Sequence, residues 1–284
     1  MTEAPTPEEL AAHGITFISN VSYLEPGREE KLDIYLPAAH FARPRPAVLL
    51  IHGGGWRIGD KASKREINIG SHLAAAGYAV FSINYLLNIG ERPGGETEPM
   101  MLTRIAWPRN LYDCKTALRY LRREAQQYGI DPGRIAVMGG SAGGHFSMML
   151  GATQHLAEYN AGGEYLEESN AVSCVINLYG VPDVRGKRAH QFSNGTAEEA
   201  EKVAAWASPI LLMDQTFPPM LIAHGTADTI VPVEVSRDLC EHVRRLGLEY
   251  WYVEISGAPH TFHLQPDAMD LRPTVVTFLQ RHIG

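Results

Sequence analysis

The stretch Arg134-Ile-Ala-Val-Met-Gly-Gly-Ser-Ala-Gly-Gly-His145 decides the fold predicted for this chain. Its first half is a short apolar run, typical of a buried strand, and the run stops at a G-x-S-x-G pattern centred on Ser141. A strand that turns at once into a helix holds the central serine in a strained backbone, and the flanking residues must be small to avoid the neighbouring strand and helix. A helix-compatible run, 146–154, follows. This context predicts that Ser141 projects from the sheet as a nucleophile.

Length and composition indicate one large α/β domain over residues 1–284. The hydrophobic content of 45% is enough to bury a full core. The formal charge of −7, without a basic stripe, argues against nucleic acid as a partner. No apolar run approaches the roughly 18 residues that span a bilayer, and residues 1–10 are acidic and Pro-rich, unlike a secretory signal. We therefore expect no membrane contact and a cytoplasmic location.

The cysteines and the paired histidines predict neither a disulfide framework nor a metal site. Cys114, Cys174 and Cys240 are an odd number and lie in apolar periodic segments, as small core residues do. The spacing of His260 and His263 is that of a metal pair, but no carboxylate or cysteine stands at a matching distance along the chain. We expect no metal and no cofactor.

Strand patterns alternate with helix patterns along the rest of the chain. Two strand-like segments, 15–23 and 31–36, flank a turn and predict an antiparallel hairpin at a sheet edge. Strands alternating with helices form a sheet that is covered on both faces, so we predict a mostly parallel eight-stranded sheet. The further expected strands are 47–51, 79–83, 135–138, 172–178, 220–224 and 250–255, and the expected helices are 66–76, 108–127, 146–154, 235–246 and 269–282.

Two insertions, 86–107 and 181–208, break this alternation. The first is too long for an ordinary link between a strand and a helix, and the second holds a turn followed by a helix at 196–206. Both leave from the carboxyl ends of strands, where the ligand sites of open α/β sheets lie. We expect them to form a lid or cap, with plain surface insertions as the alternative.

A serine nucleophile needs a general base within hydrogen-bond reach and a carboxylate that orients the base. In this strand order they follow in the sequence Ser, acid, His. Asp228 lies just beyond a predicted strand end and is the acid candidate; Asp183 is the runner-up, and Asp214 lies too far from any strand end. In the loop after the last strand, His260 is predicted as the base ahead of His263.

The strand at 47–51 ends in His52-Gly-Gly-Gly-Trp56, a loop whose bare backbone N–H groups suit a developing negative charge. The N–H of Ala142, directly after the nucleophile, can join them. His52 is expected to brace this loop by hydrogen bonding. One turn along the nucleophile helix, His145 is expected to pack or hydrogen-bond beneath the site.

In combination these motifs resemble the α/β-hydrolase esterases of the hormone-sensitive-lipase-like type, and within them the bacterial feruloyl and acetyl-xylan esterase (carboxylesterase) group. The motifs that carry the resemblance are His52-Gly-Gly-Gly-Trp56, Gly139-Gly-Ser-Ala-Gly-Gly-His145, Ser208-Pro209, the run from Pro218 through Asp228 to Val231-Pro232, and Gly257-x-x-His260-x-Phe262. The resemblance implies the α/β-hydrolase fold, a triad of Ser141, Asp228 and His260, and an oxyanion hole at the amides of Gly54, Gly55 and Ala142. Gly140 and Leu86 depart from it, because the relatives usually have Asp and Arg there.

These features predict a serine ester hydrolase that acts on a small or short-acyl ester through an acyl-enzyme. An arylformamidase, and a non-catalytic small-molecule receptor on the same fold, are the alternatives. The apolar residues of 100–107 are expected to narrow the pocket in favour of short acyl groups. The segment 249–255 is expected near the sheet edge, where either pairing with a second copy in a homodimer or coverage of the edge by a loop is consistent with the sequence. The candidate pocket residues are Trp56, Tyr85, Trp107, His145 and Tyr179.

Overall fold

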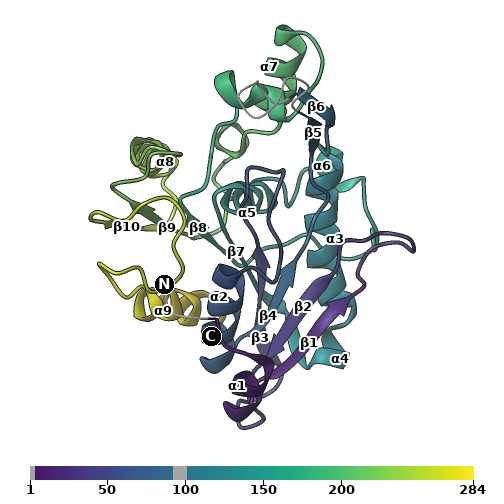
Figure 1. The fold of residues 1–284 in the computed structure, drawn as a ribbon, viewed down its shortest axis with the longest axis vertical. Helices are drawn as coiled ribbons and strands as arrows, with labels where there is room; N and C mark the ends of the chain where they lie inside the picture. Colours follow the sequence, from purple (N-terminus) through teal and green to yellow (C-terminus); the bar gives the residue numbers. More distant parts are fainter. Residues whose placement is uncertain (1–3, 92–100) are drawn as a thin grey trace.

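The computed structural model, which describes residues 4–91 and 101–284, is an eight-stranded sheet with helices on both faces (Figure 1). The strand order is β1-β2-β4-β3-β7-β8-β9-β10. Neighbouring strands from β4 to β10 are parallel, whereas β2 is antiparallel to both of its neighbours. The predicted mostly parallel eight-stranded sheet is therefore confirmed.

The elements lie close to the ranges that the sequence predicted. The strands of the large sheet are β1 (Thr16–Val21), β2 (Leu32–Leu36), β3 (Arg45–Ile51), β4 (Ala79–Ile83), β7 (Ile130–Gly140), β8 (Cys174–Leu178), β9 (Met220–Gly225) and β10 (Tyr250–Ile255). The helices are α1 (Pro7–Ala12), α2 (Lys64–Ala75), α3 (Arg109–Arg123), α4 (Ala125–Tyr128), α5 (Ala142–Ala152), α6 (Ala157–Asn160), α7 (Ala197–Trp206), α8 (Glu234–Arg245) and α9 (Arg272–Ile283). A small hairpin, β5 (Ile89–Glu91) with β6 (Met101–Arg104), and the 3-10 helices η1 (Gly186–Gln191) and η2 (Pro209–Leu211) complete the described chain.

Two apolar clusters pack on opposite faces of the sheet. On one face α3, α5 and α8 contribute their buried sides, with Phe146 fully buried among them. On the other face α2 and α9 do the same, with Phe278 fully buried. Because successive residues of a strand point to opposite faces, Val137 of β7 belongs to the first cluster and Met138 to the second. The central strand β7 is thus packed on both faces, which fixes the position of the residues that follow its carboxyl end.

The two edges of the sheet are formed by the first and last strands. The hairpin expected within 15–36 is present as β1 and β2, which pair antiparallel. At the opposite edge lies β10, so the expected edge position of 249–255 is confirmed. Pairing of that edge with a second copy of the chain stays a prediction.

Some details differ from the sequence prediction. The helix expected at 108–127 is divided into α3 and α4, and the second part ends at Gly129, whose φ of 63° is left-handed. Near the N-terminus α1 is an additional short helix, started by a capping box in which Thr6 and Glu9 satisfy each other's backbone amides. All three cysteines are buried and free of disulfides, in keeping with their expected place in the core.

The two insertions pack against each other at one end of the molecule, where α7 lies beside the β5–β6 hairpin (Figure 1). The side-chain amide of Asn194 donates to the carbonyl of Leu102 at 3.0 Å, and that of Asn88 donates to the carbonyl of Gln191 at 2.9 Å. Trp107 meets the ring of Phe192 at a centroid distance of 5.5 Å. We call this unit, the described parts of 86–107 and 181–208, the cap. Met100, one of the apolar residues expected in the lid, lies outside the described residues.

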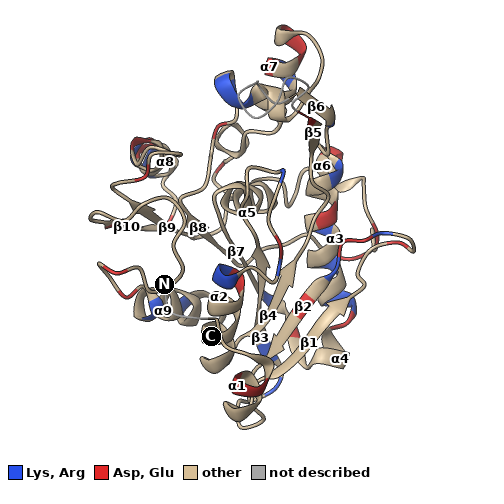
Figure 2. Ribbon diagram, viewed as in Figure 1, with Lys and Arg blue, Asp and Glu red and all other residues tan. Residues whose placement is uncertain are grey.

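Lys and Arg residues and Asp and Glu residues are both scattered over the outer helices (Figure 2). Several of the exposed arginines lie beside a carboxylate: Arg237 beside Glu254 and Arg244 beside Glu241 are examples. In the described part of the chain, the helices are all too short or too polar to cross a bilayer.

Candidate active site

Ser141 lies in the sharp turn between β7 and α5. Its φ of 54° and ψ of −119° are unusual for a residue with a side chain, and the turn holds because its amide donates to the carbonyl of Leu178 at 2.9 Å. A side chain at position 143 is excluded, since a Cβ there would lie 2.0 Å from the carbonyl oxygen of Ile51. The G-x-S-x-G pattern therefore reflects close backbone contact, and Ser141 at its centre lines a cavity.

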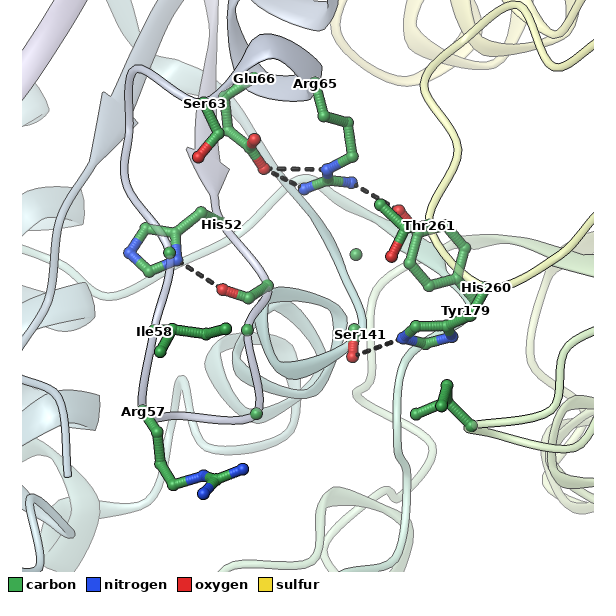
Figure 3. A pocket seen from close by; sticks show the side chains of 16 residues that line it. His52, Arg57, Ile58, Ser63, Arg65, Glu66, Ser141, Tyr179, His260 and Thr261 are labelled. Atoms are coloured by element: carbon green, nitrogen blue, oxygen red, sulfur yellow. Dashed lines mark hydrogen bonds and ion pairs between the residues drawn. The ribbon is translucent and has the colours of Figure 1, made fainter. Parts of the chain in front are cut away.

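The structure brings Ser141, His260 and Asp228 into one line of hydrogen bonds (Figure 3 shows the first). The Ser141 hydroxyl donates to Nε2 of His260 at 3.1 Å, and Nδ1–H of His260 donates to Oδ2 of Asp228 at 2.6 Å. The three side chains come from loops after β7, β9 and β10, which run parallel and so end at the same edge of the sheet. This arrangement can move a proton from the serine to the imidazole while the carboxylate holds the ring.

Asp228 is buried, and its environment keeps it ionised. Its Oδ1 accepts from the amides of Ile230 and Val231, both at 2.8 Å. Burial alone would raise the pKa of this carboxyl, but the hydrogen bonds from His260 and from the two amides outweigh it and hold the pKa below its usual value. The carboxylate can therefore orient His260 throughout the neutral range.

His224, at the end of β9, is a site residue that the sequence prediction left without a role. Its Nε2–H is shared between Oδ2 of Asp228 at 3.2 Å and the carbonyl of Val231 at 2.8 Å, and its Nδ1 accepts from the Ser236 hydroxyl at 2.6 Å. Burial lowers the pKa of His224, which favours the neutral ring. The only sequence signal was its place at a strand end, four residues before the acid candidate.

The other acid and base candidates are engaged elsewhere. His263 is buried, and its Nδ1 accepts from the amide of Gln265 at 2.9 Å. Asp183 pairs with Arg185 at 2.7 Å and accepts from the Ser208 hydroxyl, while Asp214 accepts from the amide and hydroxyl of Thr216. In residues 4–91 and 101–284 there is no cluster of three or more His, Cys, Asp or Glu side chains that could hold a metal ion.

The glycine loop after β3 lies against the nucleophile turn. Gly54 and Gly55 line the same cavity as Ser141, and a Cβ on Gly53 would lie 2.8 Å from the carbonyl oxygen of Gly140. Ala142 is the first residue of α5, where backbone amides have no acceptor within the helix. As expected, His52 braces the loop: its Nδ1–H donates to the carbonyl of Gly53 at 2.6 Å and its ring stacks on Tyr85.

The cavity beside Ser141 has a volume of about 450 Å³. Of the candidate pocket residues, Tyr179 lies on its wall, but Trp56, Tyr85, Trp107 and His145 do not. All four are buried: Trp56, Tyr85 and His145 pack behind the glycine loop, and Trp107 packs inside the cap. Further residues on the wall that sequence reasoning did not identify are Arg57, Ile58, Ser63, Arg65, Glu66, Ile230 and Thr261.

The described residues of the cap do not contribute to the cavity wall. Trp107 instead packs against Phe192 and Trp206 inside the cap, and Met101 has 64% of its surface exposed to solvent. Narrowing of the pocket by the first insertion therefore finds no support in the described part of that segment.

His145 connects the glycine loop to the cap. Nε1–H of Trp56 donates to Nδ1 of His145 at 3.2 Å, and Nε2–H of His145 donates to the carbonyl of Ala207 at 2.7 Å. Complete burial lowers the pKa of His145 to about 4, so the ring is neutral and keeps both bonds near pH 7. The position expected for His145, beneath the site, agrees with this role.

Replacing His145 with leucine is expected to destabilise the protein by several kcal/mol. The change leaves the Trp56 indole and the Ala207 carbonyl buried without partners, at about 1–3 kcal/mol each. Ser147→Ala is the matched control on the same helix, because that buried hydroxyl donates only within the helix, to Gly143. Urea denaturation of both variants measures the difference, and equal stabilities would contradict the bridging role of His145.

Comparison with known proteins places this geometry in a family. Residues 32–243 match the BD-FAE family. A curated relative, the esterase LipC of Mycobacterium tuberculosis, is 30% identical over 82% of this chain and 57% of its own length. The chain thus spans little more than half the length of the curated relatives it matches.

Solved structures agree with the family match. A truncated carbohydrate esterase from gut microbiota superposes with a TM-score of 0.79 at 26% identity, covering 94% of this chain and 96% of that one. A propionate-bound esterase of the planctomycete Thermogutta terrifontis gives a TM-score of 0.72 at 25% identity, covering 94% of this chain and 93% of that one. Together with the sheet order, the family match shows that the chain belongs to the BD-FAE family of α/β-hydrolase esterases.

Proposed function

We propose that this protein is a carboxylic ester hydrolase that works through Ser141, His260 and Asp228. The observation that carries the proposal is the unbroken hydrogen-bond line from the Ser141 hydroxyl through His260 to Asp228, at 3.1 and 2.6 Å. It starts at a strained turn that faces a cavity. The names of the relatives, which are esterases, support the same reaction class.

In the first half of the reaction Ser141 attacks the ester carbonyl while Nε2 of His260 takes the hydroxyl proton. Negative charge then develops on the carbonyl oxygen, and we assign its stabilisation to the amides of Gly54, Gly55 and Ala142. When the C–O bond to the leaving group breaks, His260 returns the proton to the departing alcohol and leaves an acyl group on Ser141.

The second half repeats these steps with water as the nucleophile. His260 takes a proton from the water as its oxygen attacks the acyl carbon, and the proton passes to Ser141 when the acid departs. Throughout both halves Asp228 stabilises the imidazolium that forms, and its lowered pKa keeps it ionised for this purpose.

We further propose that the acyl group is small. The cavity of about 450 Å³ lies in the lower part of the range of small-molecule sites and must hold both parts of the ester. The Thermogutta terrifontis esterase, 25% identical to this chain, was solved with propionate bound.

A panel of substrates tests the proposal. Purified protein should hydrolyse p-nitrophenyl acetate and butyrate with a higher kcat/KM than the octanoate, with a feruloyl ester and N-formylkynurenine measured beside them. Ser141→Ala protein, purified in the same way, is the control for contaminating esterases.

Three results, from this panel, from a binding measurement or from an EDTA treatment, would contradict the proposal. A preference for N-formylkynurenine over every ester would indicate an arylformamidase. Binding of such small molecules without turnover would favour a receptor. Activity that EDTA abolishes and zinc restores would indicate a metal hydrolase in place of the serine mechanism.

A further inference from the structure

A buried polar chain links α2 to the loop that carries His260. Nη1–H of Arg65 donates to the hydroxyl oxygen of Tyr179 at 3.0 Å, and that hydroxyl donates to the carbonyl of Phe262 at 3.0 Å (Figure 3 shows the first of these bonds). Glu66 holds the other side of the guanidinium, accepting from Nε–H at 2.9 Å and from Nη2–H. Arg65, Tyr179 and Phe262 are each less than a tenth exposed.

The direction of each bond is determined by the chemistry of the groups. A guanidinium can only donate, so the Tyr179 oxygen must accept from it, and its single proton is then free for the Phe262 carbonyl. Burial raises the pKa of Tyr179, although Arg65 opposes this, so the hydroxyl keeps its proton. Burial would also lower the pKa of Arg65, but Glu66 and Tyr179 reverse the shift and keep it charged.

The loop that carries His260 has a strained backbone, so it needs support from residues outside the loop. Thr261, between His260 and the anchored carbonyl, has a φ of 69°, which is unfavourable for a β-branched residue. The ring of Tyr179 also packs edge-on against the His260 ring, with centroids 5.0 Å apart. One tyrosine therefore contacts both the backbone beyond His260 and the imidazole ring itself.

The same two residues contact the nucleophile turn. A Cβ on Gly140 would lie 2.3 Å from Nη1 of Arg65 and 2.7 Å from the Tyr179 hydroxyl oxygen. The glycine before Ser141, where the resemblance led one to expect Asp, thus makes room for the guanidinium. This buried polar chain therefore contacts the backbone beside Ser141 and the backbone beside His260. The distance between the Ser141 and His260 side chains decides whether the proton can be transferred.

Given the proposed serine mechanism, on which this inference rests, we propose that Arg65 and Tyr179 are positioning residues that set His260 for proton transfer with Ser141. They act through the His260 loop and do not take part in the chemistry themselves. A displacement of about 1 Å of a catalytic group can cost on the order of 10²-fold in rate.

Tyr179→Phe tests the proposal because it removes only the hydroxyl and keeps the ring against His260. We expect kcat for p-nitrophenyl acetate to fall roughly 10- to 100-fold, with KM changed by less than about threefold. Tyr159→Phe is the matched control: this tyrosine is also buried and donates to a carbonyl, that of Trp206, but it does not line the cavity. It should lose comparable stability and keep its kcat.

A double-mutant cycle separates positioning from a general structural effect. If Tyr179 acts through His260, adding Tyr179→Phe to His260→Ala should leave the residual rate unchanged within about twofold. An equal loss in both backgrounds, or a single variant with the kcat of the native protein, would overturn the inference. A native protein without esterase activity would instead refute the proposed function, so the two failures are distinguishable.

Discussion

Ser141→Ala is expected to lower kcat by on the order of 10⁴-fold or more, with the melting temperature almost unchanged. The variant removes the attacking oxygen and its bond to His260 while the backbone of the turn stays in place, because the amide of residue 141 still donates to Leu178. Steady-state kinetics with p-nitrophenyl butyrate and a thermal melt measure the two quantities. Retained turnover with an intact fold would exclude Ser141 as the nucleophile.

The base assignment is tested by the two histidines of the same loop. His260→Ala should lose activity to a similar extent, since the proton acceptor for Ser141 disappears. His263→Ala should keep kcat within a few-fold and lose mainly stability, because that ring is buried and bonded to Gln265. The opposite pattern would show that the base is His263.

Gly54→Ala is expected to lower kcat by about 10²- to 10³-fold and to destabilise the protein. A Cβ at this position would lie 1.9 Å from the carbonyl oxygen of Ile58, and its φ of 116° is unfavourable for any residue with a side chain. The loop must therefore shift, and its amide N–H groups then no longer point at the oxygen on which negative charge develops. Kinetics and urea denaturation measure both effects.

Gly27→Ala provides the control for backbone strain alone. Gly27 also has a strongly positive φ, 92°, but nothing lies within 4 Å of its Cβ position, and its turn does not line the cavity. This variant should lose stability and keep kcat. If Gly54→Ala behaved in the same way, the loop would have no part in stabilising the oxyanion.

Much of the architecture could be predicted from the sequence because it depends on local patterns. Apolar runs of strand length that alternate with amphipathic segments leave few ways to bury a core, and the eight-stranded sheet follows from them. The turn around Ser141 was likewise predictable, since close backbone contact there excludes larger residues at position 143. The order of the strands also predicted that Asp228 and His260 lie at the carboxyl ends of the parallel strands, where Ser141 lies.

The sequence by itself thus determined the sheet, the nucleophile turn and the candidates for acid and base, because each has a signal within a few residues of the chain. Only the tertiary structure decided that His260 faces Ser141 while His263 turns to Gln265, and that Trp56 and His145 lie behind the cavity wall. It also decided that Tyr179 is hydrogen-bonded to both Arg65 and Phe262, although Arg65 lies 114 residues before it and Phe262 lies 83 residues after it. The physical reason is that a buried hydrogen bond between distant segments depends on how parallel strands and their loops pack, and no local pattern of residues records that packing.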